Sequence, residues 1–213
     1  MEILKLENLC EIKTGKKDVN QGNPEGKYPF FTCALEHTYS DTFSYDTEAL
    51  MIAGNGAVGN VTYYSGKFEA YQRTYILSDF NKKINVKYLN HFLQGMLKDI
   101  LKKKVLGSTM PYIKVSFLKN IEIPVPSLQE QKKIVERLDK VFENIDKAGD
   151  KLEGMVRGLP GGSFFADQFD IGDKIKGATG ELKGDFIKSI GKGGRGMTGI
   201  LKSTKFLKIG LAA

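Results

Sequence analysis

The chain has 213 residues, a formal net charge of +7 and 41% hydrophobic residues, which is sufficient for a folded core. Most of the excess positive charge lies in residues 154–213, and the charges of residues 1–153 nearly balance. Residues 1–153 therefore do not form a generally basic DNA-binding surface, and a nucleic-acid site there must be a local patch. The charged start and the longest apolar run, Ala49–Ala53, indicate neither a signal peptide nor a membrane span. We therefore expect a cytoplasmic protein.

Residue types with catalytic or metal-binding chemistry are few and scattered. Cys10 and Cys33 lie far apart and form no CxxC, so we expect buried free thiols rather than a disulfide or a metal site. His37 and His91 are the only histidines, and neither belongs to a pattern typical of a catalytic triad or a zinc site. The sequence thus predicts no enzyme, no cofactor and no metal centre.

The predicted secondary structure groups several strands before one helix. Residues 1–10 are predicted as a strand or a short helical turn, and a polar loop follows over 13–27. Strands are predicted at 28–33, 49–53, 60–64 and 71–77, and a helix over 86–104. Because strands and helix do not alternate strictly, we expect a mixed, β-rich α+β body.

A literal GxGxxG occurs at Gly54-Asn55-Gly56-Ala57-Val58-Gly59. A dinucleotide site would need a helix directly afterwards, so that its N-terminus meets the pyrophosphate. The segment that follows, Asn60–Tyr64, is instead β-branched and aromatic. We therefore predict a hairpin turn in which glycines supply positive φ angles.

A junction between Pro124 and Glu130 separates this body from a long helix. Two prolines, Pro124 and Pro126, are incompatible with a central strand. Ser127 and Glu130 then form the pattern of a capping box. A narrow apolar stripe follows at helical spacing: Leu128, Ile134, Val135, Leu138, Val141, Phe142, Ile145 and Ala148. The stripe fits either an amphipathic helix on its own core or a coiled-coil arm.

The junction resembles a known family. The run Pro124-Val125-Pro126-Ser127-Leu128-Gln129-Glu130-Gln131, followed by Ile134-Val135 and Leu138-Asp139, is similar to the proline–Glu-Gln–helix junction of DNA-specificity subunits of type I restriction-modification systems. Gly107–Thr109 and Leu118–Ile123 match the approach to that junction, and the resemblance extends back to Leu6–Leu9. It covers roughly residues 1–150.

The resemblance implies three parts: a DNA target-recognition domain over 1–126, a helical arm over 127–153, and a Gly-rich basic tail over 154–213 with an open role. Complete subunits of the family carry two recognition domains and two arms, so the chain resembles a half-subunit. The implied function is to recognise one half of a bipartite site in double-stranded DNA. The implied partners are a second copy of the chain in a homodimer, methyltransferase subunits and, through these, restriction subunits. The resemblance implies that the methyltransferase and restriction subunits carry the catalysis. The alternative is a protein–protein scaffold with a coiled-coil arm and no DNA role.

Three loops combine basic, amide and aromatic groups suited to DNA: residues 13–17 with Asn20 and Gln21, residues 71–74, and residues 102–104 leading to 107–114. Their candidate DNA-binding residues are Lys16, Lys17, Asn20, Gln21, Gln72, Arg73, Ser108, Thr109, Tyr112 and Lys114. Lysine and Ser/Thr side chains suit phosphates, whereas Arg73, Gln72, Asn20 and Gln21 suit base edges. The alternative for any one of them is an ordinary solvated surface. We expect Arg73 and Tyr112 to share one face with Lys16 or Lys17.

The arm is predicted to pack against another helix. From Ser127 to about Glu153 it would be roughly 40 Å long, close to one turn of B-DNA. Leu138, Val141, Phe142 and Ile145 are the candidate partner residues, and the partner would be a second copy's arm or a helix from the tail. Glycines at 158–162 and 191–199 are expected to interrupt helical structure in the tail.

Overall fold

The computed structural model describes residues 2–102, 111–160, 163, 167 and 170–192. The chain divides into two compact units, an N-terminal unit of residues 1–131 and a C-terminal unit of residues 132–213. The predicted α+β class, with a β-rich body and long helices, is confirmed. In the described part of the chain, no helix has the length and apolar character to cross a membrane.

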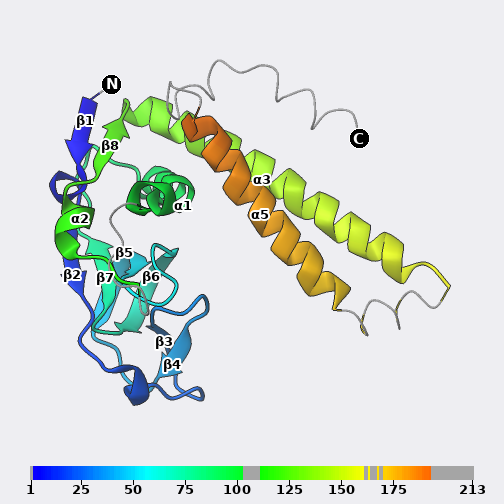
Figure 1. Cartoon of the computed structure of the whole chain (residues 1–213), viewed down its shortest axis with the longest axis horizontal. Helices are drawn as coiled ribbons and strands as arrows, with labels where there is room; N and C mark the ends of the chain where they lie inside the picture. Colours follow the sequence, from blue (N-terminus) through cyan, green and yellow to red (C-terminus); the bar gives the residue numbers. More distant parts are fainter. Residues whose placement is uncertain (1, 103–110, 161–162, 164–166, 168–169, 193–213) are drawn as a thin grey trace. The chain divides into compact units, whose positions relative to one another are not determined.

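The N-terminal unit is built on a six-stranded sheet with the order β2-β7-β5-β6-β3-β4, and β1 and β8 form a separate antiparallel pair (Figure 1). The strands are β1 Glu2–Lys5, β2 Glu11–Thr14, β3 Tyr28–Phe31, β4 Thr38–Ser40, β5 Tyr45–Ala53, β6 Val61–Ala70, β7 Thr74–Ser78 and β8 Glu122–Val125. Short 3₁₀ helices η1, Leu6–Asn8, and η2, Val19–Gln21, interrupt the first loops.

The glycine-rich segment after β5 is a hairpin turn, as predicted. β5 and β6 pair antiparallel from Ile52↔Val61 to Tyr45↔Phe68. Gly56 and Gly59 have φ angles of 57° and 77°, in the left-handed region that favours glycine. A strand follows where a dinucleotide site would need a helix.

The sheet is strongly curled. β5 pairs with β6 on one side and with β7 on the other, and the start of β7 lies beside the end of β5 through Ala53↔Thr74. Ala70 at the end of β6 is joined to Thr74 by only three residues, which span at most about 14 Å. β6 must therefore bend back toward β7. The curl encloses a cluster of buried side chains: Phe31, Ala49, Met51, Phe68, Ala70 and Ile76.

Helix α1, Val86–Leu101, lies against β6 and supplies a second apolar layer (Figure 1). Its apolar side buries Tyr88, Leu89, Phe92, Leu93 and Leu97. The Asn85 side chain accepts a hydrogen bond from Tyr88 N at 3.1 Å and so caps the helix. The predicted helix over 86–104 is confirmed as far as Leu101.

The proline junction is an edge strand followed by a capped helix. Pro124 lies in β8, which is tolerated because a two-stranded sheet has only edge strands. The predicted capping box is confirmed, since Glu130 N donates to Ser127 Oγ at 3.3 Å and Ser127 N donates to Glu130 Oε2 at 3.1 Å. The buried Gln131 amide accepts from Asn85 N at 2.7 Å and donates to Pro126 O at 2.9 Å, which ties this first turn to the start of α1.

Two long helices in the described part of the C-terminal unit run antiparallel. They are α3, Leu128–Arg157, which begins in the N-terminal unit, and α5, Ile171–Lys192. Lys183 forms an ion pair with Asp146, and Arg157 Nη1 lies 2.8 Å from Asp167 Oδ1. Between these contacts, Gly149 faces Ile175 and Thr179. Later residues of α3 thus contact earlier residues of α5, which is the pattern of an antiparallel pair.

Helix α3 ends directly before the glycine stretch at 158–162, and α5 lies between that stretch and the one at 191–199, where it ends at Lys192. Gly172, Gly177 and Gly180 all lie within α5. Each glycine costs roughly 1 kcal/mol of helix stability, but packing against a partner helix offsets local propensity. At Gly149 the missing side chain also allows close approach, because a Cβ there would lie 2.9 Å from Thr179 Cγ2.

The predicted apolar stripe of α3 changes in burial along the helix. Ile134, Val135 and Leu138 are buried, whereas Val141, Phe142 and Ile145 are half-buried. The Lys183 ammonium lies over the Phe142 ring at 5.7 Å, so part of the stripe contacts α5. α3 ends at Arg157, inside the glycine-rich stretch where the sequence predicted its end, and its 30 residues span about 45 Å.

Candidate nucleic-acid interface

The connections that carry the predicted site residues meet at one end of the curled sheet. Gln72 N donates to Lys17 O at 2.9 Å, and Gly54 N donates to Arg73 O at 3.1 Å. Ile113 N in turn donates to Gly54 O at 3.0 Å. The loop after β2, the β6–β7 turn, the β5–β6 hairpin and the segment before α2, Val115–Lys119, are therefore neighbours in that order.

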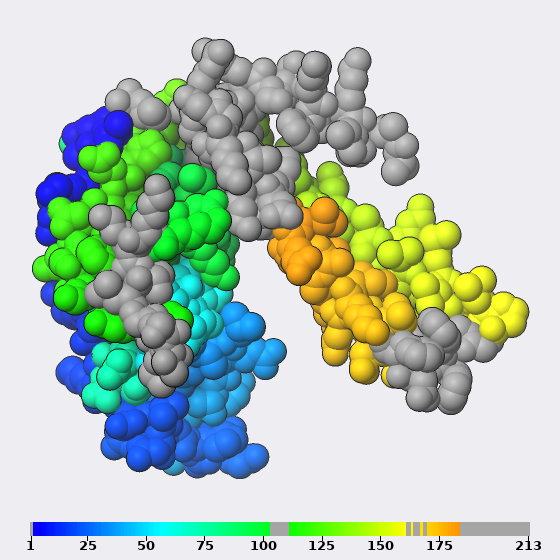
Figure 2. All heavy atoms as spheres, in the orientation of Figure 1, coloured from blue at the N-terminus to red at the C-terminus, as the bar shows by residue number. Residues whose placement is uncertain are grey.

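We call this surface the loop face and define it by Lys16, Asn55, Gln72, Arg73 and Tyr112. Lys16, Gln72, Arg73 and Tyr112 are exposed, and Asn55 is half-buried. In Figure 2, blue atoms of the first loop, turquoise atoms near residue 72 and green atoms after residue 110 adjoin one another on the N-terminal unit. The structure thus brings together residues from all three predicted loops.

The remaining predicted residues lie elsewhere or outside the described residues. Lys114 is exposed directly before α2. Asn20 and Gln21 are exposed in η2, and the Gln21 Oε1 accepts a hydrogen bond from Asp18 N at 2.7 Å. Ser108 and Thr109 lie outside the described residues.

Lys17 differs from its neighbour Lys16 because its side chain turns inward. Its ammonium donates to Ser40 Oγ at 2.9 Å and to Thr42 Oγ1 at 2.7 Å, and it lies 3.7 Å from Glu69 Oε2. The Lys17 side chain is only 22% exposed, whereas Lys16 is an exposed residue. The two lysines therefore offer different chemistry to a ligand.

A glycine allows the first loop to approach the β6–β7 turn. Gly15 N donates to Thr74 O at 3.1 Å, and Lys16 N donates to Ala70 O at 3.1 Å. A Cβ on Gly15 would lie 2.2 Å from Ala70 O, a distance that no side chain can adopt. The position of Lys16 beside the turn thus depends on a residue without a side chain.

A buried tyrosine anchors the segment that carries Tyr112. The Tyr75 hydroxyl donates to Ile113 O at 2.7 Å. Burial raises the pKa of Tyr75, so the hydroxyl remains a protonated donor at neutral pH. An isolated antiparallel bridge between Asn55 and Tyr112 holds the same segment to the hairpin.

Sequence reasoning missed the loop between β3 and β4, which borders the loop face. Ala57 N donates to Cys33 O at 2.9 Å, and the Cys33 thiol donates to Arg73 O at 3.4 Å. Beyond Cys33, the side chains of Leu35, Glu36 and His37 are exposed, and Leu35 is 73% exposed. Leu35, an apolar residue that fits no helical or strand periodicity, is the sequence feature that could have indicated this loop.

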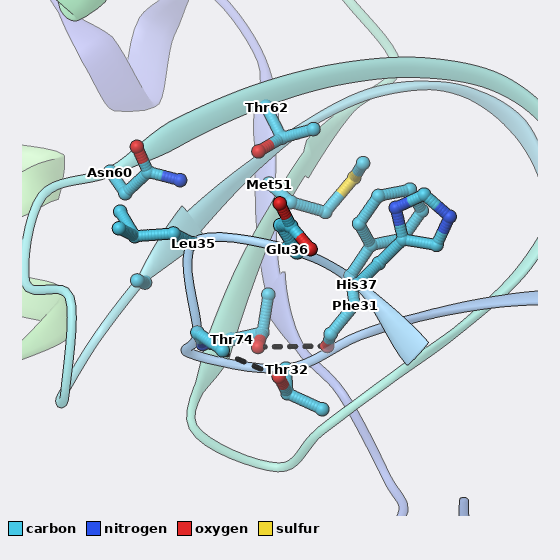
Figure 3. Close-up of a pocket in the computed structure, with 11 residues that line it drawn as sticks. Phe31, Thr32, Leu35, Glu36, His37, Met51, Asn60, Thr62 and Thr74 are labelled. Atoms are coloured by element: carbon cyan, nitrogen blue, oxygen red, sulfur yellow. Dashed lines mark hydrogen bonds between the residues drawn. The ribbon is translucent and has the colours of Figure 1, made fainter. Parts of the chain in front are cut away.

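The same loop covers a small pocket on the sheet. Figure 3 shows Leu35 and Glu36 facing Asn60 and Thr62, with Thr74 donating to the Phe31 carbonyl at 3.1 Å. The cavity measures about 30 Å³, which is room for a water molecule or two and not for a dinucleotide. The described residues contain no group of His, Cys, Asp and Glu side chains arranged to hold a metal ion.

Most of the chain matches the model of a known protein family. The family model described as type I restriction modification DNA specificity domain matches residues 1–153. The chain belongs to the type I DNA-specificity family. The resemblance seen at the proline junction is thereby confirmed.

Relatives and solved structures agree with this family. The EcoDI specificity subunit of Escherichia coli is 37% identical over 150 residues, which are 70% of this chain and 33% of that protein. The MpnII specificity subunit of Mycoplasma pneumoniae is 28% identical over 161 residues, which are 72% of this chain and 47% of that protein. The chain thus spans between a third and a half of these two relatives. Both are named for specificity rather than for catalysis.

The fold is also that of solved specificity subunits. The S subunit from M. genitalium matches with a TM-score of 0.60 and 23% identity, over 74% of this chain and 43% of that chain. The HsdS subunit from Thermoanaerobacter tengcongensis matches with a TM-score of 0.54 and 16% identity, over 86% of this chain and 43% of that chain. At these identities the likeness concerns the fold.

Proposed function

We propose that the N-terminal unit recognises a specific sequence in double-stranded DNA through the loop face. The observation that carries this proposal is the meeting of four connections, far apart in sequence, at one end of the sheet. Together they present a lysine, an arginine, two amides and a tyrosine on one surface. Membership in a family of DNA-specificity domains supports DNA as the ligand of this surface.

The residues of the loop face divide by chemistry. Lys16, together with Lys114, which follows Tyr112 by two residues, contacts phosphates, because an exposed ammonium suits an anionic oxygen in any sequence. Arg73 and Gln72 contact base edges in the major groove, since guanidinium and amide groups can form paired hydrogen bonds with guanine and adenine. Tyr112 contributes an aromatic contact at the border. Asn20 and Gln21 are further base contacts, and Ser108 and Thr109 further phosphate contacts.

We further propose that this unit recognises one half of a bipartite target. A second recognition unit, supplied by a second copy of the chain in a homodimer, recognises the other half. α3 and α5 act as the spacer and as the docking site for methyltransferase subunits, which recruit restriction subunits. The catalytic groups then belong to those partners, and the assembly acts in the cytoplasm, where its DNA is. The length of α3, about 45 Å, is on the scale of one turn of B-DNA.

Selection from a pool of randomised duplexes tests the recognition step. The full chain should enrich one common sequence, and the logarithm of its binding constant should fall linearly with the logarithm of salt concentration. Light scattering of the same sample should give the mass of two chains. A protein–protein scaffold, the alternative function, would enrich no sequence, and any salt-dependent binding to DNA would be the same for every duplex.

A further inference from the structure

A buried carboxylate lies beneath the loop face. The Glu69 side chain is completely buried, although glutamate is seldom buried without partners. Its Oε2 accepts from Ser44 Oγ at 2.8 Å, and its Oε1 accepts from Ala70 N at 3.0 Å. Its ionic partner is Lys17, whose Nζ lies 3.7 Å from Oε2. The carboxylate therefore has a defined place at the end of β6.

The Lys17 ammonium is surrounded by the protein. An ammonium has three donors, and here Ser40 Oγ, Thr42 Oγ1 and the Glu69 carboxylate lie around it. A phosphate contact by Lys17 would require it to leave these partners and the buried carboxylate. Removing one member of a buried ion pair leaves the other charge uncompensated, which is strongly unfavourable.

The backbone of Lys17 supports the turn that carries Gln72 and Arg73. Lys17 N donates to Ala70 O at 3.3 Å, and Lys17 O accepts from Gln72 N at 2.9 Å. Lys17 and Tyr71 form a parallel bridge. The Lys17 side chain binds β4, Thr42 beyond it, and β6. The Lys17 main chain binds the turn and so holds in place the two residues proposed to contact bases.

We propose that Lys17 is a positioning residue for DNA recognition, which acts through Glu69 to hold Gln72 and Arg73 in place, while Lys16 makes the phosphate contact. This inference rests on the proposed function. It separates two adjacent lysines that the sequence alone cannot distinguish.

The test compares three variants of the full chain: Lys17→Met, Lys16→Met, and the double variant Lys17→Met with Glu69→Gln. The probes are a duplex selected from the randomised pool by the unaltered chain and an unselected duplex of the same length. We expect Lys17→Met to lower affinity for the selected duplex by about tenfold, with the affinity for the unselected duplex and the salt slope unchanged. Lys16→Met should weaken binding to both duplexes and reduce the salt slope by about one.

The double variant is the control for charge. It removes the lysine charge as well, but it leaves no uncompensated buried carboxylate, so preference for the selected duplex should recover in part, while the loss due to the missing bonds to Ser40 and Thr42 remains. Equal losses on both duplexes with a salt slope lowered by about one, in Lys17→Met or in the double variant, would overturn the proposal. If Lys17→Met fails to fold, the double variant decides by the same criteria. A failure of the unaltered chain to select any sequence would instead defeat the proposed function.

Discussion

Arg73 contributes its main chain to the fold and leaves its side chain at the surface. Its carbonyl accepts hydrogen bonds from Gly54 N and from the Cys33 thiol. Within the described residues, the guanidinium forms no ion pair, and the residue is exposed. A change of this side chain therefore tests recognition with little effect on folding.

We expect Arg73→Ala to weaken binding to the selected duplex by about 1–3 kcal/mol more than binding to an unselected one, because a guanidinium that pairs with a base edge discriminates between sequences. Titration of both duplexes at one salt concentration gives the difference. Lys119→Ala, which removes an exposed charge on α2 away from the loop face, is the matched control. Equal losses on the two duplexes would assign Arg73 to a phosphate.

Cys10 should be unreactive while the N-terminal unit is folded. The predicted free, buried thiol is confirmed, and its Sγ donates to Leu6 O at 3.6 Å. Burial raises the pKa of Cys10 to about 12, so the thiolate is scarce at pH 8. Alkylation with iodoacetamide at pH 8, followed by peptide mass spectrometry, should label Cys10 only in denaturant. Rapid labelling of the native chain would contradict the buried placement.

The sequence alone indicated which chemical groups each residue offers, but not which other residues surround it in the fold. Ser127 and Glu130 were predicted because a capping box depends on two positions three residues apart. The role of Lys17 was not, because its partners Ser40 and Thr42 are 23 and 25 residues away and meet it only when the sheet curls. The exposed Leu35 loop was missed for the same reason.

At the scale of elements, the glycines of the two long helices differ in what surrounds them. A Cβ on Gly149 would lie 2.9 Å from Thr179 Cγ2 and 3.1 Å from Ile175 Cγ2. Among the residues that the structure describes, none has an atom within 4 Å of a Cβ built on Gly177. Gly149 therefore permits the contact between α3 and α5, whereas Gly177 only adds flexibility to the unfolded chain.

Gly177→Ala should stabilise the C-terminal unit by about 1 kcal/mol, because alanine has the higher helix propensity. Gly149→Ala should be about 1–3 kcal/mol less stable than Gly177→Ala, since the added methyl group overpacks the helix contact. Urea unfolding followed by circular dichroism measures both variants. Equal stabilisation would mean that α3 and α5 do not pack as described.

Helix α5 forms although it contains several glycines, each of which disfavours an isolated helix. The contacts that offset this cost, such as Lys183 with Asp146, join residues 37 positions apart and cannot be seen in a local window. The Gly54–Gly59 hairpin was predicted because its strands and turn are adjacent in sequence.

At the scale of the molecule, Leu138 tests the association of chains. Leu138 is completely buried. Leu138→Asp would bury a charge without a partner, at a cost of several kcal/mol. Because Leu138 is buried within a single chain, we expect the change to disrupt the packing of α3 and thereby to dissociate the proposed homodimer, while the N-terminal unit stays folded. Analytical ultracentrifugation reports the mass, and circular dichroism reports the sheet.

Ala148→Asp is the matched control, because it adds the same charge to α3 at an exposed position. This variant should keep the mass of the unaltered chain. A Leu138→Asp variant that remains dimeric, or one whose N-terminal unit unfolds as well, would contradict association through this helix. The family was evident from the junction sequence and the α+β class from the grouping of strands before one helix, whereas the mode of association depends on surfaces that no short motif encodes.

The side chains of Asn55, Gln72 and Arg73 form none of the hydrogen bonds described above that hold the loop face. Main-chain atoms of Lys17, Gly54, Gln72, Arg73 and Ile113 make most of these bonds, and the side chains of Lys17, Cys33 and Tyr75 add to them. Mutations at Asn55, Gln72 and Arg73 therefore leave the supporting framework intact. Under the proposed function, a lineage could acquire a new DNA target by point mutation at this surface without passing through an unfolded ancestor.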